Sequence, residues 1–262
     1  MSASSGSKAL TDYILDSCKS KAAKRLIVLF VKGILAGIYI AIGAIASLKL
    51  SAGVASPGLG DFLGATVFPI GVIAVLIMQA ELFTSDCMVM TSAFARQTKI
   101  RNVFKFLVLI LVANLVGAIF MAFLTRTSGI FNEATAQLVI NKALHKVNLP
   151  FGTLLSSAVL CNVIVCTGIC LGYSCKEEIA RIAVLWLSIA VFVLSGTEHV
   201  VANMYYLFAA LFLGGALPAT GILYNLAIAA IGNFIGGGII IAGLNYLLAR
   251  KDVANNKASD IA

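Results

Sequence analysis

The segments Glu81-Leu-Phe-Thr-Ser-Asp86 and Glu198-His-Val-Val-Ala-Asn203 each place ionisable residues in the middle of a long apolar stretch. These stretches, residues 62–95 and 178–213, are too long for one plain crossing of a bilayer, because a helix crosses with about 20 mainly apolar residues. Charge and irregular backbone at membrane depth are tolerated only where they face protein or a water-filled cavity. We therefore predict two broken helices whose interruptions line an internal site.

The composition indicates a membrane protein throughout. Of the 262 residues, 60% are hydrophobic and 11% are charged, and the mean hydropathy is +1.01. A soluble domain of this length contains a smaller fraction of apolar residues and a larger fraction of charged residues. We predict an all-α membrane protein with six transmembrane helices. Their expected ranges are 26–48, 62–95, 103–124, 151–173, 178–213 and 221–248.

Lys and Arg are distributed unevenly between the two sides of these helices. If the N-terminus is cytoplasmic, fourteen of the 19 Lys and Arg residues fall on that side and four on the other, which favours cytoplasmic termini. We expect a cytoplasmic N-terminal segment over residues 1–25, a six-helix transmembrane domain over 26–248 and a cytoplasmic tail over 249–262. Leu10, Ile14 and Cys18 share one face and predict a short interfacial helix over residues 8–24.

The net charge of +8 follows from this topological bias. Basic residues interleaved with aromatic ones, as strand-binding proteins need, do not occur in the sequence. The six cysteines contain no CxxC pair, and buried cysteine usually behaves as a small apolar residue. We expect no metal, no cofactor, no nucleic-acid partner and no enzymatic activity.

The two interruptions belong to a weak internal repeat. Each glutamate is followed, after four residues, by Asp or Asn. The next predicted helix of each half then contains a segment that begins with Asn and ends with Gly. These segments are Asn114-Leu-Val-Gly117 and Asn233-Phe-Ile-Gly236, 33 and 35 residues after the respective glutamate. Because each half has three helices, the second half enters the membrane from the opposite side. We predict a 3+3 inverted repeat with broken helices 2 and 5 and a site at the interface of the halves.

The chemistry of the breaks suits a small anion. The N-termini of half-helices direct partial positive charge into the gap. Thr84 supplies a hydroxyl, and His199 can hold or give a proton near neutral pH. Glu81 and Glu198 are interpreted first as acceptors for backbone N–H groups that the breaks leave free. Leu82 and Phe83 lie inside the first interruption and are placed to narrow a pore into a dry constriction.

Four segments together resemble the formate/nitrite transporter family. They are Lys32-Gly-Ile-Leu-Ala-Gly-Ile-Tyr39, Ala80-Glu-Leu-Phe-Thr84, Leu160-Cys-Asn162 and Ser195-Gly-Thr-Glu-His-Val-Val-Ala-Asn-Met204, and the resemblance runs from residue 25 to 250. It implies an aquaporin-like protomer in a homopentamer of the prokaryotic inner membrane, with one pore in each subunit. It further implies a channel or transporter for small monovalent anions of weak acids, such as formate, nitrite or hydrosulfide.

The resemblance also implies roles for individual residues. The family's loop threonine falls on Thr84, its central histidine on His199 and its vestibule lysine on Lys146. The implied constriction residues are Phe68, Val72, Leu82, Phe83 and Phe192, and the implied supporting residues are Glu81, Glu198, Asn162, Asn225 and Asn233. On this interpretation basic vestibules collect the anion, and His199 assists its passage together with a proton.

The substrate and two other classes of function stay open. Ser85-Asp86-Cys87 departs from the family pattern after Thr84, and with the cysteine content it favours hydrosulfide over formate and nitrite. A membrane-embedded thiol or redox protein would use Cys161, Cys166 and Cys170, but the sequence lacks the multiple membrane histidines that metal redox proteins use. An aquaporin-type neutral-solute channel is the third class, although its two Asn-Pro-Ala loops are absent.

Overall fold

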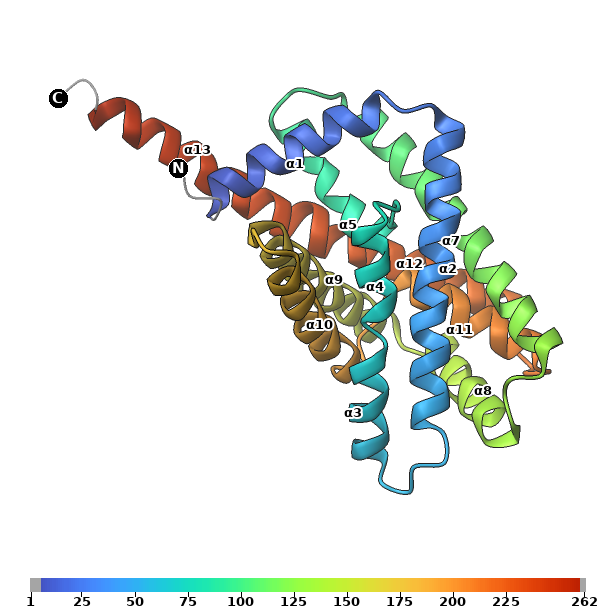
Figure 1. Cartoon of the computed structure of the whole chain (residues 1–262). Coiled ribbons are helices and arrows are strands. Elements are labelled where there is room, and N and C mark those ends of the chain that lie inside the picture. Colours follow the sequence, from blue (N-terminus) through green and yellow to red (C-terminus); the bar gives the residue numbers. More distant parts are fainter. Residues whose placement is uncertain (1–5, 260–262) are drawn as a thin grey trace.

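The computed structural model describes residues 6–259, with side chains described as far as residue 250. Residues 1–5 and 260–262, which belong to the two predicted cytoplasmic segments, lie outside the described residues. All regular elements of the described chain are helical, as predicted (Figure 1). They are α1 (Ser7–Ala22), α2 (Leu26–Ser51), α3 (Pro57–Val67), α4 (Ile70–Ile77), α5 (Phe83–Asp86), η1 (Cys87–Val89), α6 (Met90–Phe94), α7 (Ile100–Ser128), α8 (Glu133–Val147), α9 (Phe151–Ser174), α10 (Glu178–Leu194), α11 (Val200–Phe212), α12 (Ala219–Phe234), the π-helical η2 (Ile235–Ile241) and α13 (Ala242–Ser259).

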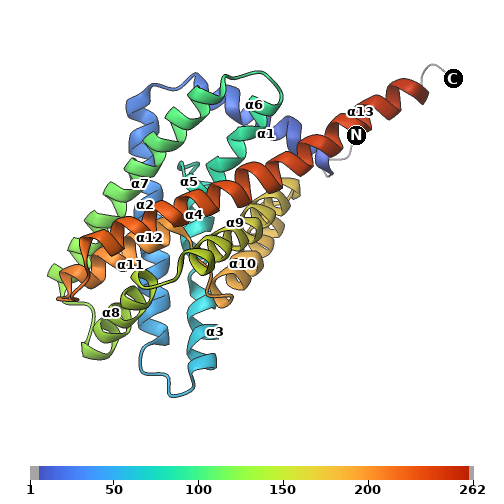
Figure 2. The ribbon, with the colours of Figure 1, turned by 180° about the vertical axis from the view of Figure 1, so that it is seen from behind.

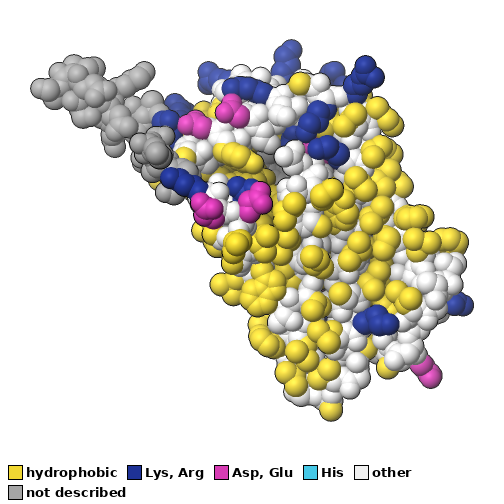
Figure 3. All heavy atoms as spheres, in the orientation of Figure 1, with side chains coloured by type: hydrophobic (Ala, Val, Ile, Leu, Met, Phe, Trp, Pro, Cys, Tyr) yellow, Lys and Arg dark blue, Asp and Glu magenta, His cyan; other side chains and the backbone are white. Residues whose placement is uncertain are grey.

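Five helical stretches of the described chain are long and apolar enough to cross a membrane, and Val200–Phe212 is a shorter apolar helix. The predicted stretch 178–213 is therefore two consecutive helices, α10 and α11. The last stretch runs without interruption from α12 through η2 into α13, so the predicted tail after residue 248 continues the same helix. Hydrophobic side chains cover the middle of the face in Figure 3, and Lys and Arg gather near the end that holds α1.

Two helix pairs pack closely in corresponding positions of the two halves. α2 lies against α7, and α9 lies against α12, as both ribbon views show (Figures 1 and 2). A Cβ added to Gly33 of α2 would lie 2.5 Å from Cβ of Ala113, and one added to Gly232 of α12 would lie 2.5 Å from Cβ of Ala158. Small residues thus allow the backbones to approach, as in many membrane helix interfaces.

Both predicted breaks are present, and each follows a left-handed residue. α4 ends at Ile77 and α5 begins at Phe83, with Gln79 at φ 51° between them. α10 ends at Leu194 and α11 begins at Val200, with Gly196 at φ 63° between them. Glycine adopts this conformation without strain, whereas glutamine does not. The Lys32 amine donates to the Gln79 carbonyl over 2.7 Å, which helps to hold the strained turn.

Two helices lie outside the apolar stretches. α1 is present as predicted, with Leu10, Ile14 and Cys18 buried, but it packs against α13, α6 and α9. This helix therefore covers one end of the protein, where the described parts of both chain ends lie (Figure 1). The long apolar stretches of the sequence do not predict the helix α8, because α8 is amphipathic. Its Asn132 N-cap accepts a hydrogen bond from the Thr135 amide over 2.9 Å.

Candidate functional site: two broken helices joined at Thr84 and His199

The two breaks meet through Thr84 and His199. The Thr84 hydroxyl lies 3.0 Å from His199 Nε2, and both side chains are almost completely buried. Thr84 is carried by α5 and His199 directly precedes α11, so the pair joins the two halves of the protein. The structure thus brings together the hydroxyl and the imidazole that the sequence analysis singled out independently.

The backbone determines which ring nitrogen of His199 carries the proton. The Ala202 amide donates to His199 Nδ1 over 3.2 Å, so that His199 caps α11. An amide N–H can only donate, and Nδ1 must therefore present its lone pair. In the neutral ring the proton then lies on Nε2, which donates to Thr84 Oγ1. The Thr84 hydroxyl hydrogen remains available for another acceptor.

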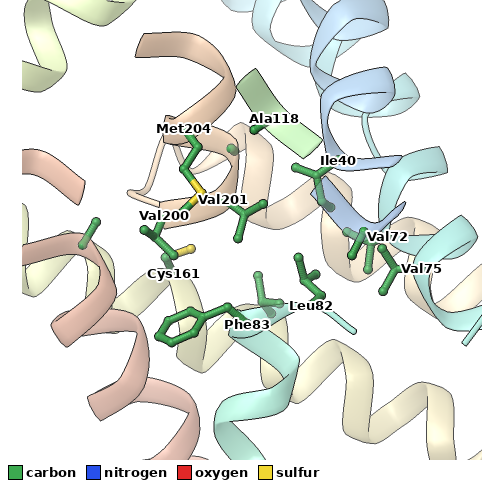
Figure 4. Packing of buried hydrophobic residues seen from close by; sticks show 14 of the residues in the cluster. Ile40, Val72, Val75, Leu82, Phe83, Ala118, Cys161, Val200, Val201 and Met204 are labelled. Carbon is green, nitrogen blue, oxygen red and sulfur yellow. The ribbon is translucent and has the colours of Figure 1, made fainter. Parts of the chain in front are cut away.

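Bulky apolar side chains surround this pair. The ring centroid of Phe192 lies 5.4 Å from that of His199 and 5.9 Å from that of Phe68. Figure 4 shows Leu82 and Phe83 extending between Val72 on one side and Val200 and Val201 on the other. All five predicted constriction residues are buried: Phe68, Val72, Leu82, Phe83 and Phe192. In this conformation the space between the breaks is filled by apolar groups.

Two asparagines hold the broken backbones in the same way. Asn114 Oδ1 accepts from the Phe83 amide over 2.9 Å, and its Nδ2 donates to the Glu81 carbonyl over 2.9 Å. Asn233 Oδ1 accepts from the Val200 amide over 2.9 Å, and its Nδ2 donates to the Glu198 carbonyl over 2.9 Å. Asn114 and Asn233, which the predicted repeat pairs, therefore make the same two backbone hydrogen bonds in their respective halves.

These bonds correct the role expected for the glutamates. We expected Glu81 and Glu198 to accept from freed backbone N–H groups, but the asparagine side chains bind those groups instead. The glutamate side chains face lysines, because a buried carboxylate requires an opposite charge or several donors. The two N-termini also offer fewer donors to an anion than we expected, since Phe83, Val200 and Ala202 already donate within the protein.

Glu198 lies in a closed network. Lys146, in the last turn of α8, donates to Glu198 Oε1 over 2.7 Å. Asn203 Nδ2 donates to Glu198 Oε2 over 2.7 Å and to Asn225 Oδ1 over 2.9 Å. Asn225 in turn donates to the Lys146 carbonyl over 2.9 Å. The predicted vestibule lysine is therefore held beside a carboxylate.

Glu81 is held by residues that the sequence analysis did not select. The Lys21 amine of α1 lies 2.6 Å from Glu81 Oε2 and also pairs with Asp86, and Lys24 lies 3.6 Å from Glu81 Oε1. Burial by itself lowers the pKa of Lys21, but Asp86 and Glu81 outweigh burial and raise that pKa above its ordinary value. Lys21 continues the buried face of α1 three residues after Cys18, and this spacing was the available signal.

Asn162 connects the two breaks from α9. Its Nδ2 donates to the Thr84 carbonyl over 3.1 Å and to the Asn233 carbonyl over 2.6 Å. Cys166, one turn further along, donates to the same Thr84 carbonyl over 3.4 Å. Cys161, Cys166 and Cys170 are all buried in the packing of α9. Among the described residues no group of three or more His, Cys, Asp or Glu side chains could hold a metal ion.

Two hollows approach the Thr84 and His199 pair from opposite ends. The Lys21 vestibule, about 460 Å³, is lined by three cations and four carboxylates, which are Lys21, Lys24, Arg181, Asp16, Glu81, Asp86 and Glu178. The Lys146 vestibule, about 360 Å³, is lined by His199, Phe68 and Phe192, and its Lys and carboxylate residues are Lys142, Lys146, Asp61 and Glu198. The prediction of basic vestibules is therefore wrong, because carboxylates balance the cations in both.

Comparison with known proteins agrees with this architecture. The sequence model of the family described as formate/nitrite transporter matches residues 8–247. A protein of Methanothermobacter thermautotrophicus named "Probable formate transporter" is 33% identical over 239 residues, which cover 83% of this chain and 87% of that protein.

Two solved structures share the fold. One titled "FNT family ion channel" superposes with a TM-score of 0.82 at 25% identity, covering 91% of this chain and 99% of the other. One titled "Pentameric formate channel with formate bound" superposes with a TM-score of 0.77 at 24% identity, covering 85% of this chain and 97% of the other.

Proposed function

The chain belongs to the formate/nitrite transporter family, and we propose that it carries small monovalent anions of weak acids across the membrane as their neutral acids. The observation that carries the proposal is the buried contact between Thr84 and His199, placed between two vestibules and enclosed by apolar side chains. The vestibules would admit the anion, and the dry segment between them would pass the acid.

Formate is the substrate that we propose first, with hydrosulfide and nitrite as the other candidates. The argument for hydrosulfide used the segment Ser85-Asp86-Cys87 and the cysteine content. The cysteines concerned lie buried against backbone and neighbouring side chains: Cys87, Cys161, Cys166 and Cys170. None of them is among the lining residues of the Lys21 or Lys146 vestibule. The names of the formate transporter and the formate-bound channel to which this chain is similar support formate.

Free-energy costs favour passage as the neutral acid. Protonating a carboxylate with an ordinary pKa near 4 costs about 4 kcal/mol at pH 7. Moving an unpaired anion into a water-free apolar segment costs several kcal/mol even after relaxation, and more without it. The balanced charges of the vestibules provide no strong field to offset that second cost. Flux would then rise as the pH falls.

His199 would act as a fixed hydrogen-bond donor. For it to supply a net proton, the ring would have to become an imidazolium, which needs a proton on Nδ1 and loses the bond from the Ala202 amide. We propose instead that Nε2–H donates to Thr84 and so turns the threonine O–H toward an oxygen of the passing acid. The neutralising proton would enter from water in the vestibules.

The remaining parts of the proposal concern assembly and orientation. We propose a homopentamer, on the likeness to the solved channel titled pentameric. We also propose a prokaryotic inner-membrane location, on the likeness to the family. Cytoplasmic termini are proposed because Lys and Arg are in excess on one side of the transmembrane helices. The Lys21 vestibule would then open to the cytoplasm and the Lys146 vestibule to the opposite side.

Flux in proteoliposomes tests the proposal. Uptake of labelled formate, nitrite and hydrosulfide would be measured between pH 5 and 8 for wild type, His199→Gln and His199→Ala. A glutamine amide can donate toward Thr84 but cannot carry a titrating proton. We expect His199→Gln to keep most of the flux and its pH slope, and His199→Ala to lose about tenfold. If formate flux through His199→Gln no longer rose as the pH fell, the fixed-donor role of His199 would be contradicted.

A further inference from the structure

A third hollow lies away from the route through the breaks. It has a volume of about 980 Å³ and is formed by the corner between α1 and α2 on one side and by the beginning of α7 on the other. Neither Thr84 nor His199 lines it. It shares Lys21 and Lys24 with the Lys21 vestibule, but Lys99, Arg101 and Lys105 line neither vestibule.

The charge of this hollow is strongly one-sided. Five cations and no carboxylate line it. Lys21 and Lys24 are engaged with Glu81, but Lys99, Arg101 and Lys105 are exposed and form no ion pair among the described side chains. The cytoplasmic excess of Lys and Arg explains why these cations lie on one side of the membrane. It does not explain why all five line a single cavity that has no carboxylate.

Two helix N-termini add to this positive field. α2 begins at Leu26 and α7 begins at Ile100, and no side chain caps either helix. The first backbone N–H groups of both helices therefore lack a side-chain partner and favour negative charge nearby. The hollow combines these two termini with the three unpaired cations.

The other wall of the hollow is apolar. Leu26, Phe106 and Leu109 line it, and Leu26 is 70% exposed. Val112 and Val116, which follow Leu109 by three and seven residues and are 47% and 42% exposed, continue the apolar surface along the same face of α7. A free inorganic phosphate would use the cations but leave this wall unfilled. A ligand with a phosphate at one end and a hydrocarbon chain at the other fits both parts.

We propose that this hollow binds an anionic phospholipid, with its phosphate among Lys99, Arg101 and Lys105 and its acyl chain along α7. Basic pockets between membrane helices at the cytoplasmic surface are suited to anionic headgroups. The inference rests on the membrane orientation proposed above, but not on any particular transported anion. A lipid at this position would contact the α1–α2 corner, next to the lysines that hold Glu81.

Native mass spectrometry of the full chain in detergent tests this proposal. The protein would be titrated with dioleoylphosphatidylglycerol, with dioleoylphosphatidylcholine and with inorganic phosphate. We compare wild type with the triple variant Lys99→Gln, Arg101→Gln, Lys105→Gln. The matched control is Lys8→Gln, Lys19→Gln, Lys176→Gln, which removes three exposed cations outside the hollow.

We expect the first triple variant to bind phosphatidylglycerol about 100-fold more weakly, from the attraction of three cations to an anionic lipid, and the control to bind like wild type. Equal loss in the control, equal binding of phosphatidylcholine, or displacement of the lipid by equimolar phosphate would overturn the proposal. So would dissociation of the oligomer in the triple variant, because the hollow would then be a subunit contact. Formate flux is a separate measurement, so the two proposals can fail independently.

Discussion

At the first break Gln79 turns the chain two residues before Glu81, and at the second break Gly196 does so two residues before Glu198. An asparagine from the next long helix then binds the same two backbone groups in each half. Both glutamates pair with a lysine from a helix outside the breaks. The backbone support of the two breaks is thus duplicated almost atom for atom.

The side chains that bind the two buried glutamates differ between the breaks. Five residues after its glutamate, the first break has Asp86 and the second has Asn203. Asn203 donates to Glu198, so a single lysine completes the network. Asp86 adds a second carboxylate, and the first break needs Lys21 as well as Lys24 from the α1 end of the chain. Each break therefore depends on a helix that precedes its own three helices, α1 for the first and α8 for the second, but the first needs two lysines and the second needs one.

The largest expected effect tests what the breaks share. Asn114→Ala and Asn233→Ala each remove a buried side chain that bonds one amide and two carbonyls. Unsatisfied buried groups cost about 1–3 kcal/mol each, so the three groups released in each variant lower its stability by about 3–9 kcal/mol. Thermal unfolding in detergent measures this, with the exposed Asn141→Ala as control. If only one of the two variants is destabilised, the breaks are not equivalent.

A second prediction tests what separates them. Lys21→Ala leaves Asp86 buried without its cation, and breaking a buried pair costs about 3–5 kcal/mol. Asp86→Asn makes the first break resemble the second, and in the double variant it should recover about 1–2 kcal/mol of that loss. Unfolding of the two single variants and the double variant gives the coupling. Strict additivity would mean that Asp86 does not create the need for Lys21.

The smallest effect concerns α1, which supplies Lys21. Burial raises the pKa of Cys18 on this helix from 9.0 to about 11. Folding favours the neutral thiol, so its contribution to stability is present below pH 9 and is lost as the pH rises toward 11. At pH 8 we expect alkylation of Cys18 about 100-fold slower than for a thiol of ordinary pKa.

Peptide mass spectrometry can follow Cys18 and the half-buried Cys175 in the same sample. Lys21→Ala should speed the alkylation of Cys18, because undocking of α1 removes the burial that dominates its pKa. The rate at Cys175 serves as the internal control and should not change. A slower rate at Cys18 would show that α1 stays docked without Lys21, because the Lys21 charge lowers the pKa of Cys18 in the docked helix.

Much of the architecture could be predicted from local patterns. Apolar stretches interrupted by Glu81 and Glu198 were sufficient to predict both breaks, because charge inside such a stretch is costly unless protein surrounds it. The amphipathic α8 was missed, since its polar face hides it from a search for long apolar stretches. The apolar pattern of α1 does not predict the role of Lys21, because the apolar residues of its buried face end at Cys18 and the next position on that face is charged.

The amino-acid sequence by itself determined the bilayer as solvent, the positions of the breaks and the residue types available there. These features depend on local composition and spacing. Tertiary structure alone decided the partners, because a contact such as that of Thr84 with His199 joins residues 115 positions apart. It decided that Asn114 and Asn233 bind the broken backbones and that the glutamates bind lysines. It also determined the proton position on His199, through a backbone amide whose direction only the fold sets.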